Sequence, residues 1–252
     1  MKQIVYILAL TISTFVFGQS NTLFEQGNSL YNDGKYQEAI NSYEAILENG
    51  EHSAELYYNL ANAYYKLNSI APSIYYYEKA LLLNPNDEEI KNNAAFARNM
   101  TVDAIDTIPE VGFTRIMKTI TNIFSFDSWA IFSIGFVFAF VVFFLMYYFS
   151  YATNKKRFLF LSSGTSIVFA LITLFFAFQK FNLDQNDNPA IVFAKESQIK
   201  TEPNLRSEEA FRLHEGTKVQ VLESLKDWQR IKLSDGKIGW IPKQDIKLLN
   251  NF

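Results

Sequence analysis

The sequence predicts a multidomain membrane protein that joins an all-α solenoid, a two-helix transmembrane hairpin and a small all-β barrel. Three observations lead to this fold class. Uncharged runs at 128–149 and 158–179 are each about 20 residues long, the length of a helix that crosses a bilayer. Upstream of them, a helical pattern recurs at a spacing of about 34 residues. Downstream, short alternating runs are separated by turn residues.

The composition limits the functions open to this chain. Its 252 residues have a net charge of −3 and contain no cysteine, which excludes disulfides, thiolate metal sites and cysteine nucleophiles. The sequence has no phosphate-binding loop, zinc-protease or serine-hydrolase motif, and its two histidines, His52 and His214, lie far apart. We therefore expect no catalytic residues, no metal site, no cofactor and no enzymatic activity.

Residues 1–18 have the pattern of a secretory signal peptide. A lysine lies near the start, the centre is apolar, and small or apolar residues occur at Val16 and Gly18. An uncleaved anchor is the alternative, because Phe15 and Phe17 are bulky near the expected cleavage site. Both interpretations place the following domain outside the cytoplasm.

Residues 19–107 contain the internal repeat and end in an apolar segment from Glu88 that predicts a capping helix. Small and large apolar residues recur at matching places in the two copies. They are Gly27, Leu30, Gly34, Tyr36, Ala39, Tyr43 and Ile46 in the first copy and Leu60, Ala61, Tyr64, Ser73, Tyr77, Ala80 and Pro85 in the second. This pattern resembles the tetratricopeptide repeat. Asn68 and Ile70 replace Gly34 and Tyr36, which leaves the form of the second inter-helix turn open.

The resemblance implies a concave surface that binds a protein partner. By the family's pattern this surface takes Phe24, Asn28 and Tyr31 from the first unit and Tyr58, Asn62 and Tyr65 from the second. Lysines that hold a terminal carboxylate in some members are absent, so we expect an extended internal segment as the ligand. A repeat module without any ligand is the alternative. Thirteen acidic and five basic residues in 19–107 argue against nucleic acid.

Residues 108–127 predict an amphipathic connecting helix, with apolar residues at helical spacing and Arg115 and Lys118 on the other side. Two positions stay open for it, the membrane surface and the repeat module. The segment 150–157 between the two spans carries Lys155, Lys156 and Arg157. Short basic loops face the cytoplasm, so we expect both ends of the hairpin outside it. A pair of buried helices in a soluble core is the alternative, but neither run has a polar stripe.

A polar linker over 180–187 leads to a predicted all-β domain at 188–252. A turn at Glu215 and Gly216, a tight hairpin at Asp235 and Gly236, and the segment GWIP resemble the bacterial SH3-like domain. The residues expected to alternate into its core are Val219, Val221, Ile231, Leu233 and Ile238. Trp228 and Trp240 are candidates for a ligand groove. The alternative is that Trp240 packs beneath the barrel and is largely buried.

The order of these modules resembles, over nearly the whole chain, the BatE-type proteins of bacterial Bat aerotolerance operons. The resemblance implies a scaffold in the inner membrane, with both soluble domains in the periplasm, that serves an envelope-stress or aerotolerance complex. The implied partners are von Willebrand factor A-type membrane proteins and, through them, a MoxR-type ATPase. A cell-wall anchoring or sensing protein that binds peptidoglycan through its SH3-like domain is the alternative. Transport is disfavoured, since neither span carries an ionisable residue.

Overall fold

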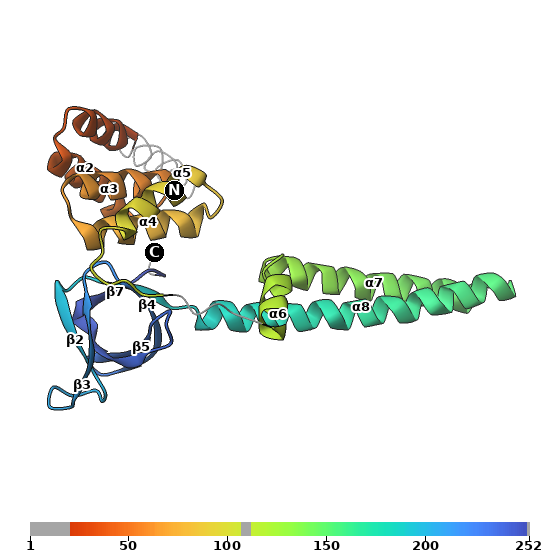
Figure 1. Cartoon of the computed structure of the whole chain (residues 1–252). Helices are drawn as coiled ribbons and strands as arrows, with labels where there is room; N and C mark the ends of the chain where they lie inside the picture. The colour runs from red at the N-terminus through yellow and green to blue at the C-terminus, as the bar shows by residue number, and fades with distance from the viewer. Residues whose placement is uncertain (1–20, 107–111, 251–252) are drawn as a thin grey trace, which may run out of the picture. The chain divides into compact units, whose positions relative to one another are not determined.

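The computed structural model describes residues 21–106 and 112–250, so the expected signal peptide at 1–18 lies outside the described part of the chain. These residues form two compact units. One unit combines 21–106 with 188–250, and the other consists of 112–187 (Figure 1). The first unit is therefore discontinuous in sequence, because the second is inserted into it.

The N-terminal part of the first unit is helical and has the predicted repeat. The chain is helical over residues 21–32, and the helices that follow are α2 (Tyr36–Glu48), α3 (Ala54–Lys66), α4 (Ile70–Leu83) and α5 (Glu88–Arg98). Helices that are neighbours in sequence pack against each other (Figure 1). The tetratricopeptide-like region is thus confirmed as a helical module.

The two inter-helix turns have the same form, although the sequence left the second one open. Gly34 has φ +78°, and Asn68, one repeat length later, has φ +57°. In both turns the following residue donates its backbone N–H to a carbonyl five residues earlier. Lys35 donates to Leu30, and Ser69 donates to Tyr64. Asparagine tolerates the left-handed region better than most residues, so it replaces the glycine without changing the turn.

Tyrosine rings fill the space between the repeats. Tyr43 and Tyr77 are buried at matching positions, and Gly27 lets the first helix approach Tyr43 closely. A Cβ atom added at Gly27 would lie 2.4 Å from Cε1 of Tyr43. A larger residue at this position would push the two helices apart.

The second unit consists of three helices, α6 (Phe113–Thr121), α7 (Phe126–Phe149) and α8 (Thr153–Asn186). Helices α7 and α8 are 24 and 34 residues long and apolar enough to cross a membrane. They form an antiparallel hairpin. The ring of Trp129 stacks 5.0 Å from that of Phe176 at one end, and Tyr147 lies 5.6 Å from Phe160 near the other.

The helices of this unit differ in length from the predicted segments. The connecting helix covers only 113–121, and it ends before the serine cap at Ser125 that starts α7. Helix α8 includes most of the predicted loop, from Thr153, and nearly all of the predicted linker, to Asn186. No glycine or proline interrupts these polar ends, so the helix propagates through them. An ion pair of 2.7 Å between Lys180 and Asp184, one turn apart, also supports it.

The C-terminal part of the first unit is an antiparallel all-β domain, as predicted. Its strands are β1 (Pro189–Val192), β2 (Glu196–Lys200), β3 (Glu209–His214), β4 (Lys218–Leu225), β5 (Trp228–Lys232), β6 (Ile238–Pro242) and β7 (Ile246–Leu248). They form one sheet in the order β3-β2-β6-β5-β4-β1-β7, which curls round on itself (Figure 1). A short 3₁₀ turn, Lys243–Asp245, leads into β7.

The core of this domain agrees with the predicted alternation except at Ile238. Four of the five expected residues are buried, but Ile238 is 43% exposed. In β6 the inward positions are Gly239 and Ile241 instead. A Cβ atom at Gly239 would lie 2.4 Å from Cγ2 of Ile199, so only glycine allows β2 to pack this closely. Because side chains alternate along a strand, the inward Gly239 places Ile238 on the outer face.

Candidate functional site

The repeat module contains a groove lined by the residues that the family's pattern selected. Two adjoining pockets of about 330 Å³ and about 230 Å³ share Tyr31 and Asn62. The first is lined by Asn28, Tyr31, Asn32, Tyr43, Asn59 and Asn62, and the second by Tyr31, Tyr58, Asn62, Tyr65, Lys66, Tyr77, Asn93 and Phe96. Five of the six predicted residues therefore line one continuous surface.

Hydrogen bonds between tyrosines and asparagines form the floor of the groove. The hydroxyl of Tyr43 donates to Oδ1 of Asn28 at 2.7 Å, and Nδ2 of Asn59 donates to the same oxygen at 3.0 Å. One repeat length later, Tyr77 donates to Oδ1 of Asn62 and Asn93 donates to it at 3.4 Å. The two copies of the repeat thus have the same polar arrangement.

The tyrosine hydroxyls in this arrangement stay protonated at physiological pH. Burial raises the pKa of Tyr43 to about 12 and also raises the pKa of Tyr77. Each hydroxyl therefore remains a hydrogen-bond donor to its asparagine. This fixes the amide so that its oxygen faces the floor.

These hydrogen bonds limit what Asn28 and Asn62 can offer a ligand. Each Oδ1 atom already accepts two hydrogen bonds within the protein. An amide nitrogen carries two N–H donors, and a side-chain hydrogen bond with the Tyr58 hydroxyl involves the amide of Asn62. The groove thus offers amide donors, which suit the carbonyl oxygens of an extended peptide backbone.

Tyr58 is also tied down by neighbouring side chains. Its hydroxyl donates to Oε1 of Glu89 at 2.6 Å and accepts from Nδ2 of Asn93 at 2.7 Å. Burial raises the pKa of Tyr58 to about 12. These contacts join α3 to α5, so the expected capping helix contributes part of the groove wall.

Phe24 lies apart from the other predicted residues. Its ring lies 5.9 Å from that of Tyr43 and lines a separate pocket of about 250 Å³. That pocket also contains His52 and Glu55 from the start of the second repeat. The family's pattern places Phe24 correctly on the first helix, but its side chain does not line the groove.

Sequence reasoning missed Asn59, Asn93 and Phe96. Asn59 and Asn93 are one repeat length apart, and this spacing is a signal that a search for matching polar residues finds. Phe96 lies on the capping helix one repeat length after Asn62, so the same spacing also places it on the groove. Lys66 is the single charged residue among those that line the two pockets of the groove.

The two tryptophans of the β-domain lie on its outer face. Trp228 is opposite Pro242 and Trp240 is opposite Arg230 in the pairing of β5 with β6. Both residues are of intermediate exposure, so Trp240 is partly buried but is not enclosed in the core. The inward Gly239 is again the reason, because it turns the neighbouring Trp240 outward.

The three basic residues of the hairpin lie at the start of α8. Lys156 and Arg157 line a pocket of about 320 Å³ together with aromatic rings, and the Lys156 ammonium lies 5.1 Å from the ring centre of Tyr147. Lys155 lies in the same first turn. The structure therefore gathers the positive charge at one end of the hairpin.

Comparisons with known proteins agree with the two modules of the first unit. A family model described as tetratricopeptide repeat matches residues 24–88, and one described as bacterial SH3 domain matches residues 197–247. No curated protein matches the chain. A crystal structure of an NlpC/P60 family protein from Bacillus cereus is 18% identical, with a TM-score of 0.22, over 28% of this chain and 23% of its own. The match thus spans less than a quarter of that protein's chain.

Proposed function

We propose that this protein is a membrane-anchored scaffold that holds a protein partner in the groove of its repeat module and has no enzymatic activity of its own. The observation that carries this proposal is the repeated tyrosine and asparagine arrangement of the groove. A tetratricopeptide repeat indicates protein binding, and the groove gives that general role specific chemistry.

The chemistry of the groove favours an extended peptide segment. The amides of Asn28 and Asn62 supply donors for backbone carbonyls at a repeated spacing, and the rings of Tyr31 and Tyr65 supply apolar contact area. Because Lys66 is the single charge in the lining, side-chain charge contributes little to recognition. Affinity would come from backbone hydrogen bonds and from burial of the aromatic rings.

The exposed apolar surface of the hairpin supports the membrane anchor. In α7 only Trp129 and Ser133 are buried, although the helix is almost entirely apolar. A core helix of a soluble protein would bury most of this surface against protein. Both helices also satisfy their backbone hydrogen bonds internally, as a lipid environment requires.

The discontinuous first unit supports a location of both soluble modules on the same side of the membrane. Residues 21–106 and 188–250 belong to one compact unit, so the inserted hairpin must return the chain to the side from which it left. The positive charge of Lys155, Lys156 and Arg157 then favours a cytoplasmic loop and two external modules. In a bacterium with two membranes, this places the modules in the periplasm and the anchor in the inner membrane.

The order of modules supports a more specific partner. It resembles the BatE-type proteins, so the proposed complex is one for envelope stress or aerotolerance. The scaffold would then bind von Willebrand factor A-type membrane proteins and, through them, contact a MoxR-type ATPase.

Co-purification of the intact protein from solubilised membranes tests the scaffold proposal. Phe96 is 61% exposed in the groove, so Phe96→Ala removes contact area and leaves the core unchanged. Leu82→Ala is the matched control, because Leu82 is also an exposed apolar residue, 44% exposed on α4, and does not line the groove. We expect the partner to be lost with Phe96→Ala and retained with Leu82→Ala. Equal recovery with both variants would contradict the groove as the binding site.

Peptidoglycan binding through the β-domain is a second candidate. The match to the bacterial SH3 domain favours it, and so do Trp228 and Trp240, which lie partly exposed on adjacent strands. Sedimentation of the full-length protein with purified cell wall tests this function. We expect Trp240→Ala to reduce sedimentation if the outer face holds the wall. No sedimentation of the unchanged protein would remove this candidate.

A further inference from the structure

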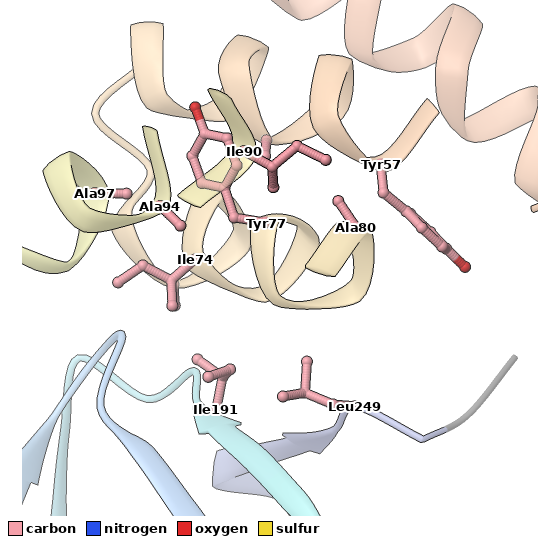
Figure 2. Close-up of a cluster of buried hydrophobic side chains, with 11 residues drawn as sticks. Tyr57, Ile74, Tyr77, Ala80, Ile90, Ala94, Ala97, Ile191 and Leu249 are labelled. Carbon is pink, nitrogen blue, oxygen red and sulfur yellow. The ribbon is translucent and has the colours of Figure 1, made fainter. Parts of the chain in front are cut away.

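The β-domain and the repeat module share one buried apolar cluster. Ile191 of β1 and Leu249, which follows β7, are fully buried and point toward α4 in Figure 2. There they join Ile74 and Tyr77 of α4 and Ala94 of α5. Residues from opposite sides of the inserted hairpin thus build a single core.

Gly216 brings the two modules into close contact. A Cβ atom at this position would lie 2.8 Å from Cγ2 of Thr101, 2.9 Å from Cγ2 of Ile70 and 2.9 Å from Cδ1 of Ile74. All three neighbours belong to the helical module or to the segment that follows it. The turn that the sequence identified by its Glu215 and Gly216 pair is therefore also a packing surface for α4.

Charged groups complete this contact. The carboxylate of Glu78 on α4 has a side-chain exposure of 6% and pairs with Arg98 and, at 2.7 Å, with Lys218 of β4. Burial opposes the charge of Glu78, but Lys218 and Arg98 outweigh it and hold its pKa below the usual range. A buried carboxylate that loses one of its cations is strongly destabilising, so Glu78 depends on the β-domain.

Asp103 makes a second polar connection. It accepts hydrogen bonds from the backbone N–H of His214 at 2.7 Å and from the hydroxyl of Thr217 at 2.6 Å. Nδ1 of His214 also lies 2.7 Å from its carboxylate. These bonds attach the segment after α5 to the turn that contains Gly216.

We propose that the β-domain is the C-terminal cap of the helical repeat module. Stacked repeats bury their apolar faces against neighbours, and a module ends stably only where a cap covers the last face. Two repeats and α5 are few for a stable solenoid, and the β-domain covers the exposed side of α4. This inference stands on the first unit alone and holds whether or not α7 and α8 cross a membrane.

The cap also supports the groove. Tyr77 belongs to the same apolar cluster, but its ring points away from Ile191 and Leu249 in Figure 2, and its hydroxyl donates a hydrogen bond to Asn62 in the groove floor. The contact surface uses α4 and the segment after α5, so the groove stays open while the cap is in place. Loss of the cap would loosen Tyr77 and, through it, one of the two peptide-binding asparagines.

Hydrogen exchange of the full-length protein in detergent, read by mass spectrometry, tests this role. Leu249→Asp places a carboxylate in the shared cluster, whereas Leu205→Asp makes the same change at a site that is 79% exposed in the same domain. We expect Leu249→Asp to speed the exchange of α4 and α5 amides by about tenfold or more, and Leu205→Asp to leave it unchanged. Full unfolding of the β-domain by Leu249→Asp would produce the same acceleration, because the cap is then lost.

A second variant, which places no charge in the core, separates loss of the cap from a general effect of the buried carboxylate. Lys218→Met removes one cation from Glu78 but changes a side chain that is half-exposed on β4. Lys232→Met, at an exposed position of the neighbouring strand β5, is its control. We expect faster exchange in α4 with Lys218→Met only. Unchanged exchange in α4 and α5 for both Leu249→Asp and Lys218→Met would overturn the proposal.

Discussion

The hydroxyl of Tyr43 donates a hydrogen bond of 2.7 Å to Oδ1 of Asn28, and this contact decides what the groove can offer a ligand. It occupies the amide oxygen and leaves the amide nitrogen as a donor. The same contact recurs between Tyr77 and Asn62. A structural hydrogen bond and a binding surface therefore use the same asparagine, and experiments on Asn28 must separate the two roles.

The first prediction concerns the structural role of Asn28. Asn28→Ala leaves the buried hydroxyl of Tyr43 without its acceptor, which costs about 1–3 kcal/mol of stability. Adding Tyr43→Phe removes that hydroxyl, so the double variant should lose less stability than the sum of the single variants. Thermal unfolding of the full-length protein measures this cycle. Strict additivity would show that the hydrogen bond contributes nothing.

The second prediction is an acid sensitivity at Asp103. Burial alone would raise the pKa of Asp103, but the hydrogen bonds from Thr217 and His214 outweigh it and the pKa lies below its usual range. A group with a lowered pKa stabilises the fold above its unfolded pKa of about 3.9 and loses this effect as the pH falls through the lower, folded value.

Thermal unfolding between pH 7 and pH 3 measures this effect. The stabilisation by Asp103 should be constant down to about pH 5 and decline below about pH 4. Asp103→Asn should lower stability at neutral pH and flatten the acid decline, whereas the exposed Asp106→Asn should do neither. An Asp103→Asn variant with the pH profile of the unchanged protein would contradict this account.

The third prediction concerns the hairpin turn between β5 and β6. Gly236 has φ +89°, so Gly236→Val forces a β-branched residue into the left-handed region at a cost of about 1 kcal/mol or more. Ser234→Val changes an exposed residue of the same turn and is the control. We expect the melting temperature to fall with Gly236→Val alone. The assigned turn is wrong if both variants melt at the same temperature.

The fourth prediction is topological. Alkaline-phosphatase fusions after Ile108 and after Phe252 should both be active, because the proposal places both ends of the hairpin outside the cytoplasm. An inactive fusion at either point would contradict the proposed orientation. Replacement of Lys155, Lys156 and Arg157 by glutamine should mix the orientations without preventing insertion, which the same fusions report.

Local patterns in the sequence predicted most of the fold. The spacing of Gly27, Tyr43 and Tyr77 identified the repeat, and the alternation around Val219 and Ile231 identified the β-domain. The error at Ile238 arose because glycine carries no hydrophobic signal. The inward position of Gly239 depends on its contact with Ile199, a residue from a distant strand. The end of α8 was also not predicted. Polar residues around Asp184 continue this helix beyond its apolar span, so the apolar run alone does not show where the helix ends.

The contact between the two soluble modules could not be predicted from the sequence. Glu78 and Lys218 are 140 positions apart, and nothing in either local pattern connects them. The candidate site was more accessible to prediction, because repeats place equivalent residues at equivalent positions. The orientation of the amides of Asn28 and Asn62 could not be predicted, because it depends on the hydroxyls of Tyr43 and Tyr77 in the second helix of each unit.

The most direct test of the proposed scaffold is co-purification of partners with Asn28→Asp and Asn62→Asp together. Aspartate keeps an oxygen that accepts from Tyr43 and Tyr77, so the fold is retained, but it removes the amide donors that a peptide would use. Asn41→Asp with Asn92→Asp adds the same charge at exposed positions that do not line the groove.

The account predicts that the partner recovered from membranes with the unchanged protein is lost with the groove pair and retained with the control pair. Recovery of the same partner in equal amounts with the groove pair, while its melting temperature is unchanged, would contradict the claim that this groove binds it.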